Sequence, residues 1–251
     1  MRWQRALVTG ASSGIGAAFA RRLAGQGASV VAVARREERL RDLPGDVEVL
    51  AADLTDPDGV AAVEHRIGKG DIDLLVNNAG FTSMGPVVDI AAGKVADEVA
   101  LLVVAVTRLT RAALPPMLER GRGGILNVSS VVGFYPSAQM ATYAGAKAFV
   151  NSFTESVAEE VRGSGVQVAV LCPGLTRTEF HGVAGMGELR NLPSFAWMDA
   201  DAVASAGLDG LARGRTVIVP GAVNKALVAT LKVTPRSFTR RAVGIVQRLR
   251  S

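Results

Sequence analysis

Seven short apolar runs alternate with helical segments along most of this chain, and no other feature of the sequence restricts its fold as strongly. The runs expected to form strands are 6–9, 29–34, 47–51, 73–76, 125–128, 166–171 and 216–219. Segments with helical periodicity lie between them, at roughly 14–25, 57–68, 93–119, 142–163 and 199–212. The strands are nearly all apolar, as is typical of parallel strands covered by helices on both faces. We therefore expect an α/β fold with a doubly wound parallel sheet and right-handed crossovers.

The chain is expected to form one domain followed by a short tail. Its 251 residues suit a single α/β domain, and 49% of them are hydrophobic, enough for a large core. The domain is predicted over 1–220 and the tail over 221–251. Nine of the 28 basic residues and none of the 23 acidic ones lie beyond Asp209, so residues 1–209 carry a net charge of −4 although the whole chain carries +5.

Several classes of protein are disfavoured by the sequence. The single cysteine, Cys172, excludes an internal disulfide and agrees with a reducing, cytoplasmic location. No secretory signal is recognisable, and the longest apolar run, 99–106, is shorter than the ~20 residues that cross a bilayer. No basic face with interleaved aromatic residues indicates a nucleic-acid partner. His65 and His181 lie far apart without clustered acids or cysteines, so no metal site is expected.

A glycine-rich turn, 9-TGASSGIG-16, follows the first expected strand and opens the first helix. Gly10, Gly14 and Gly16 have the spacing GxxxGxG. Glycines permit a tight turn and a close approach of the backbone to a pyrophosphate, while the helix N-terminus supplies N–H groups and partial positive charge. A purely structural turn is the alternative, but the position between a strand and a helix favours a nucleotide.

The end of the second strand indicates which nucleotide. An acid there would bind the adenosine ribose 2′-hydroxyl, whereas cations accommodate a 2′-phosphate. The sequence is 33-VARREERL-40, which has no acid at the strand end and continues with Arg35 and Arg36. Arginines that open a helix are often only solvated surface, but guanidinium groups match the geometry of a phosphate. The predicted cofactor is therefore NADP(H).

With 77-NNAG-80, 143-YAGAK-147 and 173-PGLTRT-178 added, the chain resembles the short-chain dehydrogenase/reductase family, in its NADP-preferring single-domain branch. The resemblance covers residues 1 to about 220 and implies a Rossmann-type fold. It places the pyrophosphate against Gly10, Ser12, Ser13, Gly14, Ile15 and Gly16, and the adenine beside Asp53 and Leu54. It places the adenosine ribose beside Asn78, Ala79 and Gly80, and the nicotinamide beside Pro173, Gly174, Thr176 and Thr178.

The pair Tyr143 and Lys147 is expected to carry the chemistry. Residues four apart in a helix share a face, so both side chains can point into one cleft. We expect the ammonium, the positive nicotinamide of the oxidised cofactor and the start of the helix to lower the pKa of Tyr143. The resemblance makes Tyr143 the general acid in reduction and the general base in oxidation. It also assigns the nicotinamide ribose to Lys147 and the substrate carbonyl to Ser130.

One position departs from the family's pattern. The family's catalytic asparagine would fall about 25 residues after the first Asn of NNAG, where this chain has Leu102. A leucine is not expected to hold the water or shape the bulged helix attributed to that asparagine. The proton relay of the family is therefore not expected in its usual form.

Apolar residues dominate the loops that bound the substrate cleft in the family. They are Phe134, Tyr135, Met140, Phe180, Met186, Phe195, Trp197 and Met198, the last five in the predicted substrate loop 179–198. They favour a lipophilic carbonyl or alcohol, although residues that only pack the loop would give the same composition. We expect an NADP(H)-dependent oxidoreductase. The alternative, motivated by Leu102, is an NADP-binding sensor or scaffold with little or no catalysis.

The tail combines an apolar stripe with basic residues. In 235–250, Phe238, Ala242, Ile245, Val246 and Leu249 share one helical stripe, and five arginines lie off it. A shorter stripe is expected in 224–233. A helix packed on its own domain or on a neighbouring subunit is one interpretation, and reversible contact with an anionic membrane is the other. The family resemblance also implies a homodimer or homotetramer that pairs through the helices expected at 93–119 and 142–163.

Overall fold

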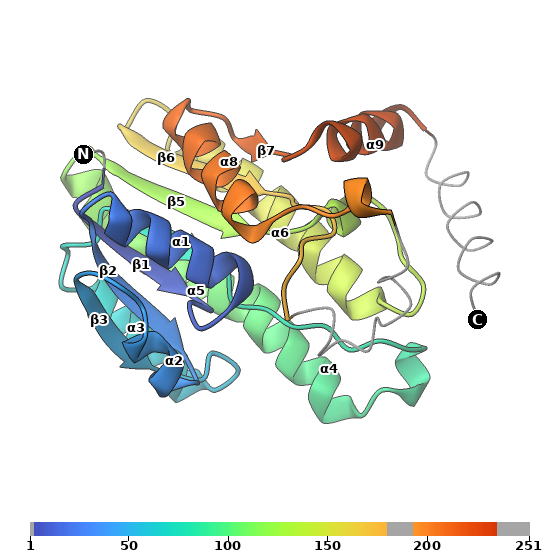
Figure 1. Cartoon of the computed structure of the whole chain (residues 1–251), viewed down its shortest axis with the longest axis horizontal. Helices are drawn as coiled ribbons and strands as arrows, with labels where there is room; N and C mark the ends of the chain where they lie inside the picture. Colours follow the sequence, from blue (N-terminus) through green and yellow to red (C-terminus); the bar gives the residue numbers. More distant parts are fainter. Residues whose placement is uncertain (1–2, 180–192, 235–251) are drawn as a thin grey trace.

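The structure is a computed structural model, and it describes residues 3–179 and 193–234. Seven parallel strands form one sheet in the order β3-β2-β1-β4-β5-β6-β7 (Figure 1). They are β1 (Arg5–Thr9), β2 (Ser29–Ala34), β3 (Val47–Ala51), β4 (Leu74–Asn77), β5 (Gly123–Val128), β6 (Val166–Leu171) and β7 (Val217–Ile218). The strand order reverses between β1 and β4, so the predicted doubly wound parallel sheet is confirmed.

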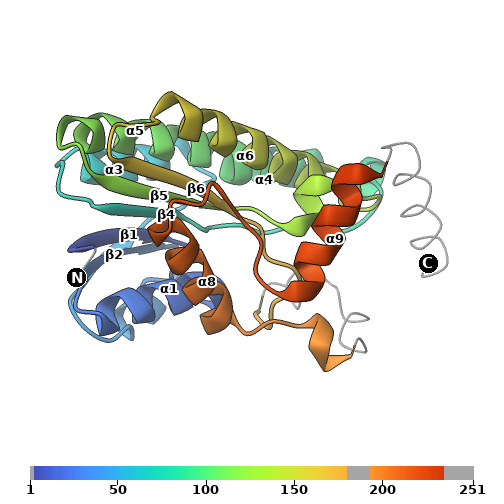
Figure 2. The ribbon, with the colours of Figure 1, turned by 90° about the horizontal axis from the view of Figure 1, so that it is seen from above.

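Helices cover both faces of the sheet (Figure 2). One face carries α1 (Gly14–Gly25) and α8 (Ala200–Ala212), and the other carries α3 (Pro57–Ile67), α5 (Val106–Glu119) and α6 (Ala141–Glu160). The other helices in the described part of the chain are α2 (Glu37–Arg41), α4 (Ala92–Val99), α9 (Ala222–Val233), the π-helix η2 (Ala100–Ala105) and the 3₁₀-helices η1 (Val87–Asp89), η3 (Val131–Phe134) and η5 (Ser194–Ala196).

A hydrophobic core lies on each face of the sheet, and successive residues of one strand pack into different cores. This explains why the strands are apolar throughout. Leu7 packs with Val31 and Leu75 on the side of α3, α5 and α6. Val8, the next residue, packs with Phe19 on the side of α1 and α8. Leu7 and Val8 are both fully buried. Strands with two covered faces have no solvent side on which polar residues would be favoured.

The segment predicted as one helix over 93–119 is interrupted by the π-helical turn η2. Leu102 lies within this turn, so the expectation that a leucine could not shape a bulged helix is wrong. Leu101, Leu102 and Ala105 are buried there, and apolar packing of this kind can support the wide turn without a polar side chain at position 102.

The continuous run 92–119 is long and apolar enough to cross a membrane by length and composition. Core helices of globular proteins pass the same test. Here Leu109 and Ala113 belong to the core between α5 and the sheet.

Helix α9 lies at the carboxyl-terminal edge of the sheet, close to η3 (Figure 2). Val228 is buried there, while Val223 and Leu227 are exposed. The segment expected at 224–233 is therefore helical and packs on its own domain. The stripe expected at 235–250 lies outside the described residues.

Candidate active site

A cleft of about 1120 Å³ lies at the carboxyl ends of the strands. The segments that follow β1, β2, β4, β5 and β6 all contribute to its walls. Every cofactor-binding and catalytic residue predicted from the sequence lines this cleft, except Gly16. Carboxyl ends of parallel strands meet at one edge of a sheet, so residues far apart in sequence converge here.

The geometry of the glycine-rich turn suits a phosphate group. Gly10 and Gly14 have φ of +67° and +54°, a conformation that favours glycine. A Cβ on Gly16 would overlap the carbonyl oxygen of Gly10, so only glycine lets α1 begin this close to the turn. The helix N-terminus therefore reaches the cleft and can face an anion. The turn residues that line the cleft are Gly10, Ser12, Ser13, Gly14 and Ile15.

Asn78 joins this turn to the segment after β4. Its backbone N–H donates to Thr9 Oγ1 and its Nδ2 donates to the Thr9 carbonyl, both at 2.9 Å. The Ala79 N–H also donates to Thr9 Oγ1, at 3.0 Å. These bonds hold the segment 78–80 against the end of β1, in the middle of the cleft wall.

Two arginines follow β2, and Arg36 reaches the glycine-rich turn. Its Nε and Nη2 donate to Ser12 Oγ at 3.3 and 3.1 Å, and Nη2 also donates to Ser13 Oγ at 3.0 Å. Arg35 instead pairs with Asp53, at 3.7 Å between Nη1 and Oδ2. Burial would raise the pKa of Asp53, but hydrogen bonds from Thr55 and the charge of Arg35 outweigh it and hold the pKa below its usual value.

Glu179, in the segment after β6, lies across the same corner of the cleft. It accepts hydrogen bonds from Arg39 at 2.8 and 2.9 Å and from Arg36 at 3.2 Å. Arg39 and then Arg36 hold the pKa of Glu179 below its usual value. Glu179 is therefore already paired with Arg36, the arginine that reaches the glycine-rich turn and could hold a phosphate group there.

Lys147 is buried beneath the catalytic end of the cleft. Its Nζ donates to the carbonyl oxygen of Val128, at 2.8 Å, and lies 5.5 Å from the centre of the Tyr143 ring. Burial lowers the pKa of Lys147 to about 8. The pair expected from the YAGAK spacing thus shares one side of the site.

Tyr143 differs from the expectation in its acidity. Burial raises the pKa of Tyr143 above its usual value, a hydrogen bond with the Ser130 hydroxyl opposes this, and the neighbouring Glu98 and Tyr135 raise it further. The prediction that the protein's own groups lower this pKa is therefore wrong. Desolvation of the phenolate is the largest cause, because the Tyr143 side chain is buried.

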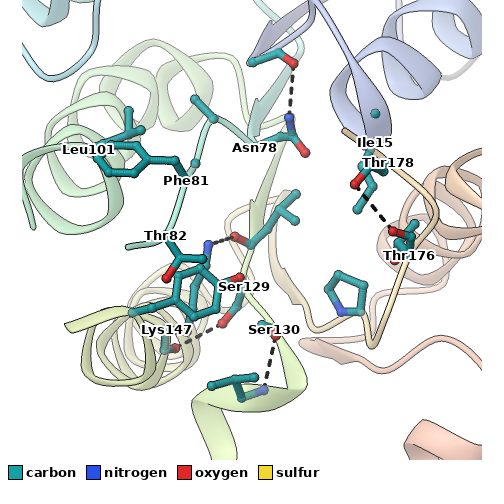
Figure 3. A pocket seen from close by; sticks show the side chains of 18 of the residues that line it. Ile15, Asn78, Phe81, Thr82, Leu101, Ser129, Ser130, Lys147, Thr176 and Thr178 are labelled. Atoms are coloured by element: carbon teal, nitrogen blue, oxygen red, sulfur yellow. Dashed lines mark hydrogen bonds between the residues drawn. The ribbon is translucent and has the colours of Figure 1, made fainter. Parts of the chain in front are cut away.

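The adjacent serines have different roles in the structure. Ser129 Oγ donates to the backbone carbonyl of Lys147, at 3.0 Å, and so ties β5 to α6. Ser130 Oγ accepts from the Val132 N–H at 3.2 Å and also bonds Tyr143. Figure 3 shows both serines and Lys147 on one side of the pocket and Ile15, Thr176 and Thr178 on the other. Ser130 thus contacts the Tyr143 hydroxyl, while the Ser129 hydroxyl is bonded to the backbone of α6.

Comparison with known proteins identifies the family. Residues 4–187 match the family model described as short chain dehydrogenase. The chain belongs to this family.

Individual relatives cover most of the chain. The 3-oxoacyl-[acyl-carrier-protein] reductase FabG of Vibrio cholerae is 39% identical over 180 residues, 69% of this chain and 74% of that protein. A short chain dehydrogenase of Pseudocercospora fijiensis is 38% identical over 193 residues, so this chain matches less than two thirds, 62%, of that protein's length.

Two solved structures are similar along nearly the whole chain. A short-chain dehydrogenase from Sphingobium yanoikuyae in complex with NADPH is 36% identical, with a TM-score of 0.81 over 92% of this chain and 96% of that one. The bulky-bulky ketone specific alcohol dehydrogenase from Comamonas testosteroni is 31% identical, with a TM-score of 0.78 over 94% and 96%.

The family's asparagine position is apolar in this member. Leu102 is fully buried and packs with Tyr143 and Ala146. Two buried polar residues, Thr82 and Glu98, were not predicted from the sequence. Glu98 stands four residues before Leu102, a helical spacing that could have drawn attention to it.

The wall available to a substrate is largely apolar. Tyr135 and Met140 line it as predicted, and Met84, Leu101 and Leu227 add to it. Phe180 and Met186 lie outside the described residues, as does the side chain of Phe195. Phe134, Trp197 and Met198 are half-buried and, contrary to the prediction, do not line the cleft. Helix α9 also borders this cleft, through Val223, Asn224 and Leu227, which nothing in the local sequence indicates.

Proposed function

We propose that this protein is an NADP(H)-dependent oxidoreductase that interconverts a carbonyl and an alcohol on a lipophilic small molecule in the cytoplasm. The observation that carries the proposal is that Ser130, Tyr143 and Lys147 share one cleft with the glycine-rich turn and Arg36. Proton transfer and nucleotide binding are thereby brought to the same place.

The residues of the cleft fit the cofactor. The turn 10–16 would hold the pyrophosphate, and Arg36 with Arg35 would hold the 2′-phosphate. Bound NADPH supplies the hydride. The NADPH complex of the Sphingobium relative supports this choice of nucleotide.

The chain's own residues would handle the carbonyl oxygen and its proton. Ser130 and Tyr143 are hydrogen-bonded, so both hydroxyls can be directed at one oxygen atom. The raised pKa of Tyr143 keeps it protonated at neutral pH, which suits the acid in reduction. In oxidation the same residue must lose its proton, and positive charge brought beside the phenol would favour this.

The substrate class follows from the wall of the cleft. Burying an apolar compound against Met84, Leu101 and Met140 would be favourable. The Comamonas relative is specific for bulky-bulky ketones, and the Vibrio relative is a reductase of 3-oxoacyl groups on acyl-carrier protein. Both act on carbonyl compounds, which supports the proposal.

The test is NADPH oxidation across a panel of bulky ketones, aldehydes, quinones and β-ketoacyl thioesters, measured with the wild type and with Tyr143→Phe. We expect turnover of at least one class, reduced about 100-fold or more in the variant. Full turnover by Tyr143→Phe would overturn the assignment of Tyr143. Tight NADPH binding without turnover on any substrate would favour the sensor or scaffold instead.

A further inference from the structure

Glu98 is the one buried residue of helix α4. It is fully buried, whereas the other residues of this helix are exposed or half-buried. Burial of a carboxyl group without a partner costs several kcal/mol, and an apolar side chain at this position would avoid that cost. The position of Glu98 is therefore unfavourable for stability alone.

The polar groups around Glu98 lead toward the catalytic cleft. Among the residues that the structure describes, neither Glu98 carboxylate oxygen has a hydrogen-bond partner, and nor does the Thr82 hydroxyl. The Thr82 hydroxyl and the Ser83 N–H are nonetheless near enough to lower the pKa of Glu98. Thr82 lines the cleft but Glu98 does not, so Thr82 lies between the carboxyl group and the site. Figure 3 shows Thr82 on the same side of the pocket as Lys147.

Glu98 is coupled electrostatically to both residues of the catalytic pair. Burial raises the pKa of Glu98, and the charge of Lys147 opposes this. A charge on Glu98 in turn raises the pKa values of Tyr143 and Lys147. These two residues of α6 are the titratable groups that act on or respond to Glu98. The three therefore titrate as a set and not independently.

Helix α4 and the turn η2 bring no other polar side chain to this place. Leu102, one turn after Glu98, presents only carbon atoms to Tyr143 and Ala146. Leu101 and Ala105 are likewise apolar and buried. Any exchange of protons between the catalytic pair and this helix must therefore involve Glu98.

We propose that Glu98 is a positioning acid of this active site, whose carboxyl group exchanges protons with Tyr143 through the Thr82 hydroxyl, in place of a polar side chain at position 102. This rests on the proposed function. In reduction, the Tyr143 O–H bond breaks as an O–H bond forms on the substrate oxygen. The phenolate then takes a proton from Thr82, directly or through one water, as Thr82 takes one from Glu98. The Glu98 carboxylate is left beside Lys147 and regains a proton from the water of the cleft through the Thr82 hydroxyl, and oxidation runs the same steps in reverse.

The kinetic test compares Glu98→Gln with Asp97→Asn, the exposed neighbouring acid. We expect Glu98→Gln to lower kcat about tenfold and to alter the pH profile of kcat. It should change KM less than about twofold, because Glu98 does not line the cleft. Asp97→Asn should match the wild type. Equal kcat and pH profiles for the two variants would overturn the proposal.

Thr82 provides a second arm through a double-mutant cycle. Thr82→Val, which keeps the shape but removes the hydroxyl, should lose about as much kcat as Glu98→Gln, and Thr82→Ser should restore it. The double variant should be no slower than either single variant, because two residues of one relay act as a unit. Losses that multiply in the double variant would overturn the relay.

Infrared spectra of the protein without cofactor or substrate separate this inference from the proposed function. We expect a protonated-carboxyl band that titrates with pH, that is absent in Glu98→Gln and that persists in Asp97→Asn. In Lys147→Met the band should persist to higher pH, since the charge of Lys147 lowers the pKa of Glu98. A Glu98 band that ignores Lys147→Met would overturn the coupling even if no carbonyl substrate were found.

Discussion

At the scale of single residues, Lys147 is a basic side chain that the fold buries. Burial lowers its pKa to about 8, against an ordinary value near ~10.4 in an unfolded chain. Below about pH 8 the folded protein must hold a buried charge that the unfolded chain exposes to water. Between about pH 8 and ~10 the folded lysine is neutral while the unfolded lysine still holds its proton, so raising the pH through this range removes the destabilisation.

Lys147→Met should therefore show the penalty directly. As the pH rises from about 7 to about 10, we expect the wild type to gain about 2–3 kcal/mol in free energy of unfolding relative to the variant, because only the wild type loses the penalty of a buried charge. Denaturant unfolding at both pH values measures it. Lys69→Met, at an exposed position, is the matched control and should show no such change. A pH-independent difference for Lys147→Met would mean that the lysine keeps its ordinary pKa when folded.

Arg36 and Arg39 allow a residue-scale test of cofactor choice. Both pair with Glu179, but Arg36 also reaches Ser12 and Ser13 of the glycine-rich turn. We expect wild-type protein to bind NADPH more tightly than NADH by roughly 1.5–3 kcal/mol, the scale of a hydrogen bond to a charged group. Calorimetry should show that Arg36→Met removes most of this preference by weakening NADPH binding alone, while Arg39→Met has little effect. Equal dissociation constants in the wild type would contradict the assignment.

At the scale of elements, a chain of buried polar groups joins the two central strands to the helices on one face. Asn127 of β5 donates to Thr154 of α6 at 3.0 Å and accepts from Asn77 of β4 at 2.9 Å. Asn77 also donates to Thr110 of α5, at 3.2 Å. All four side chains are buried, so helix α6, which carries Tyr143 and Lys147, is fixed to β5 by more than apolar contact.

Asn127→Ala should loosen this connection. Loss of the amide leaves buried partners with fewer hydrogen bonds, and we expect a loss of about 2–4 kcal/mol in the free energy of unfolding. Ser156→Ala, which removes an exposed hydroxyl of α6 that bonds the Ser152 carbonyl, should change it by less than about 0.5 kcal/mol. Thermal unfolding of the two variants makes the comparison. Similar values for both would mean that the buried network contributes little.

At the scale of the whole molecule, η2, α5 and α6 expose large apolar side chains to water. Val104, Leu118 and Phe149 are each at least 40% exposed, and Phe149 stacks on Phe153 with ring centres 5.6 Å apart. We predict that two copies pair through this face, in agreement with the family resemblance.

Phe149→Glu should give a monomer by light scattering at micromolar concentration, because it places a charge in the interface. Val88→Glu, at an 85% exposed position of η1, is the control and should leave the assembly intact. A monomeric wild type would contradict the prediction.

Membrane contact through the basic tail remains a prediction of the sequence. Because α9 borders the cleft through Val223, Asn224 and Leu227, a truncation that tests the tail must end after Thr234 and not after Pro220. Full-length protein should sediment with anionic vesicles at low salt and be released by salt, and the truncated protein should not sediment. Identical behaviour of the two would leave the tail without a role in membrane binding.

The sequence by itself determined the features that depend on local period and spacing. Apolar runs between helical segments specified the parallel sheet, the glycines fixed the turn before α1, and the four-residue spacing placed Tyr143 and Lys147 on one face of α6. Each of these requires only a few neighbouring residues, so each could be predicted from the chain alone.

Only the tertiary structure decided how distant segments bury one another. It placed Glu98 out of water behind Thr82, formed a π-helical turn around Leu102, and brought α9 to the wall of the cleft. It also raised the pKa of Tyr143 where the helical spacing had suggested a lower one. The physical reason is that desolvation depends on every side chain packed around a group, and that environment is assembled from parts of the chain that are far apart in sequence.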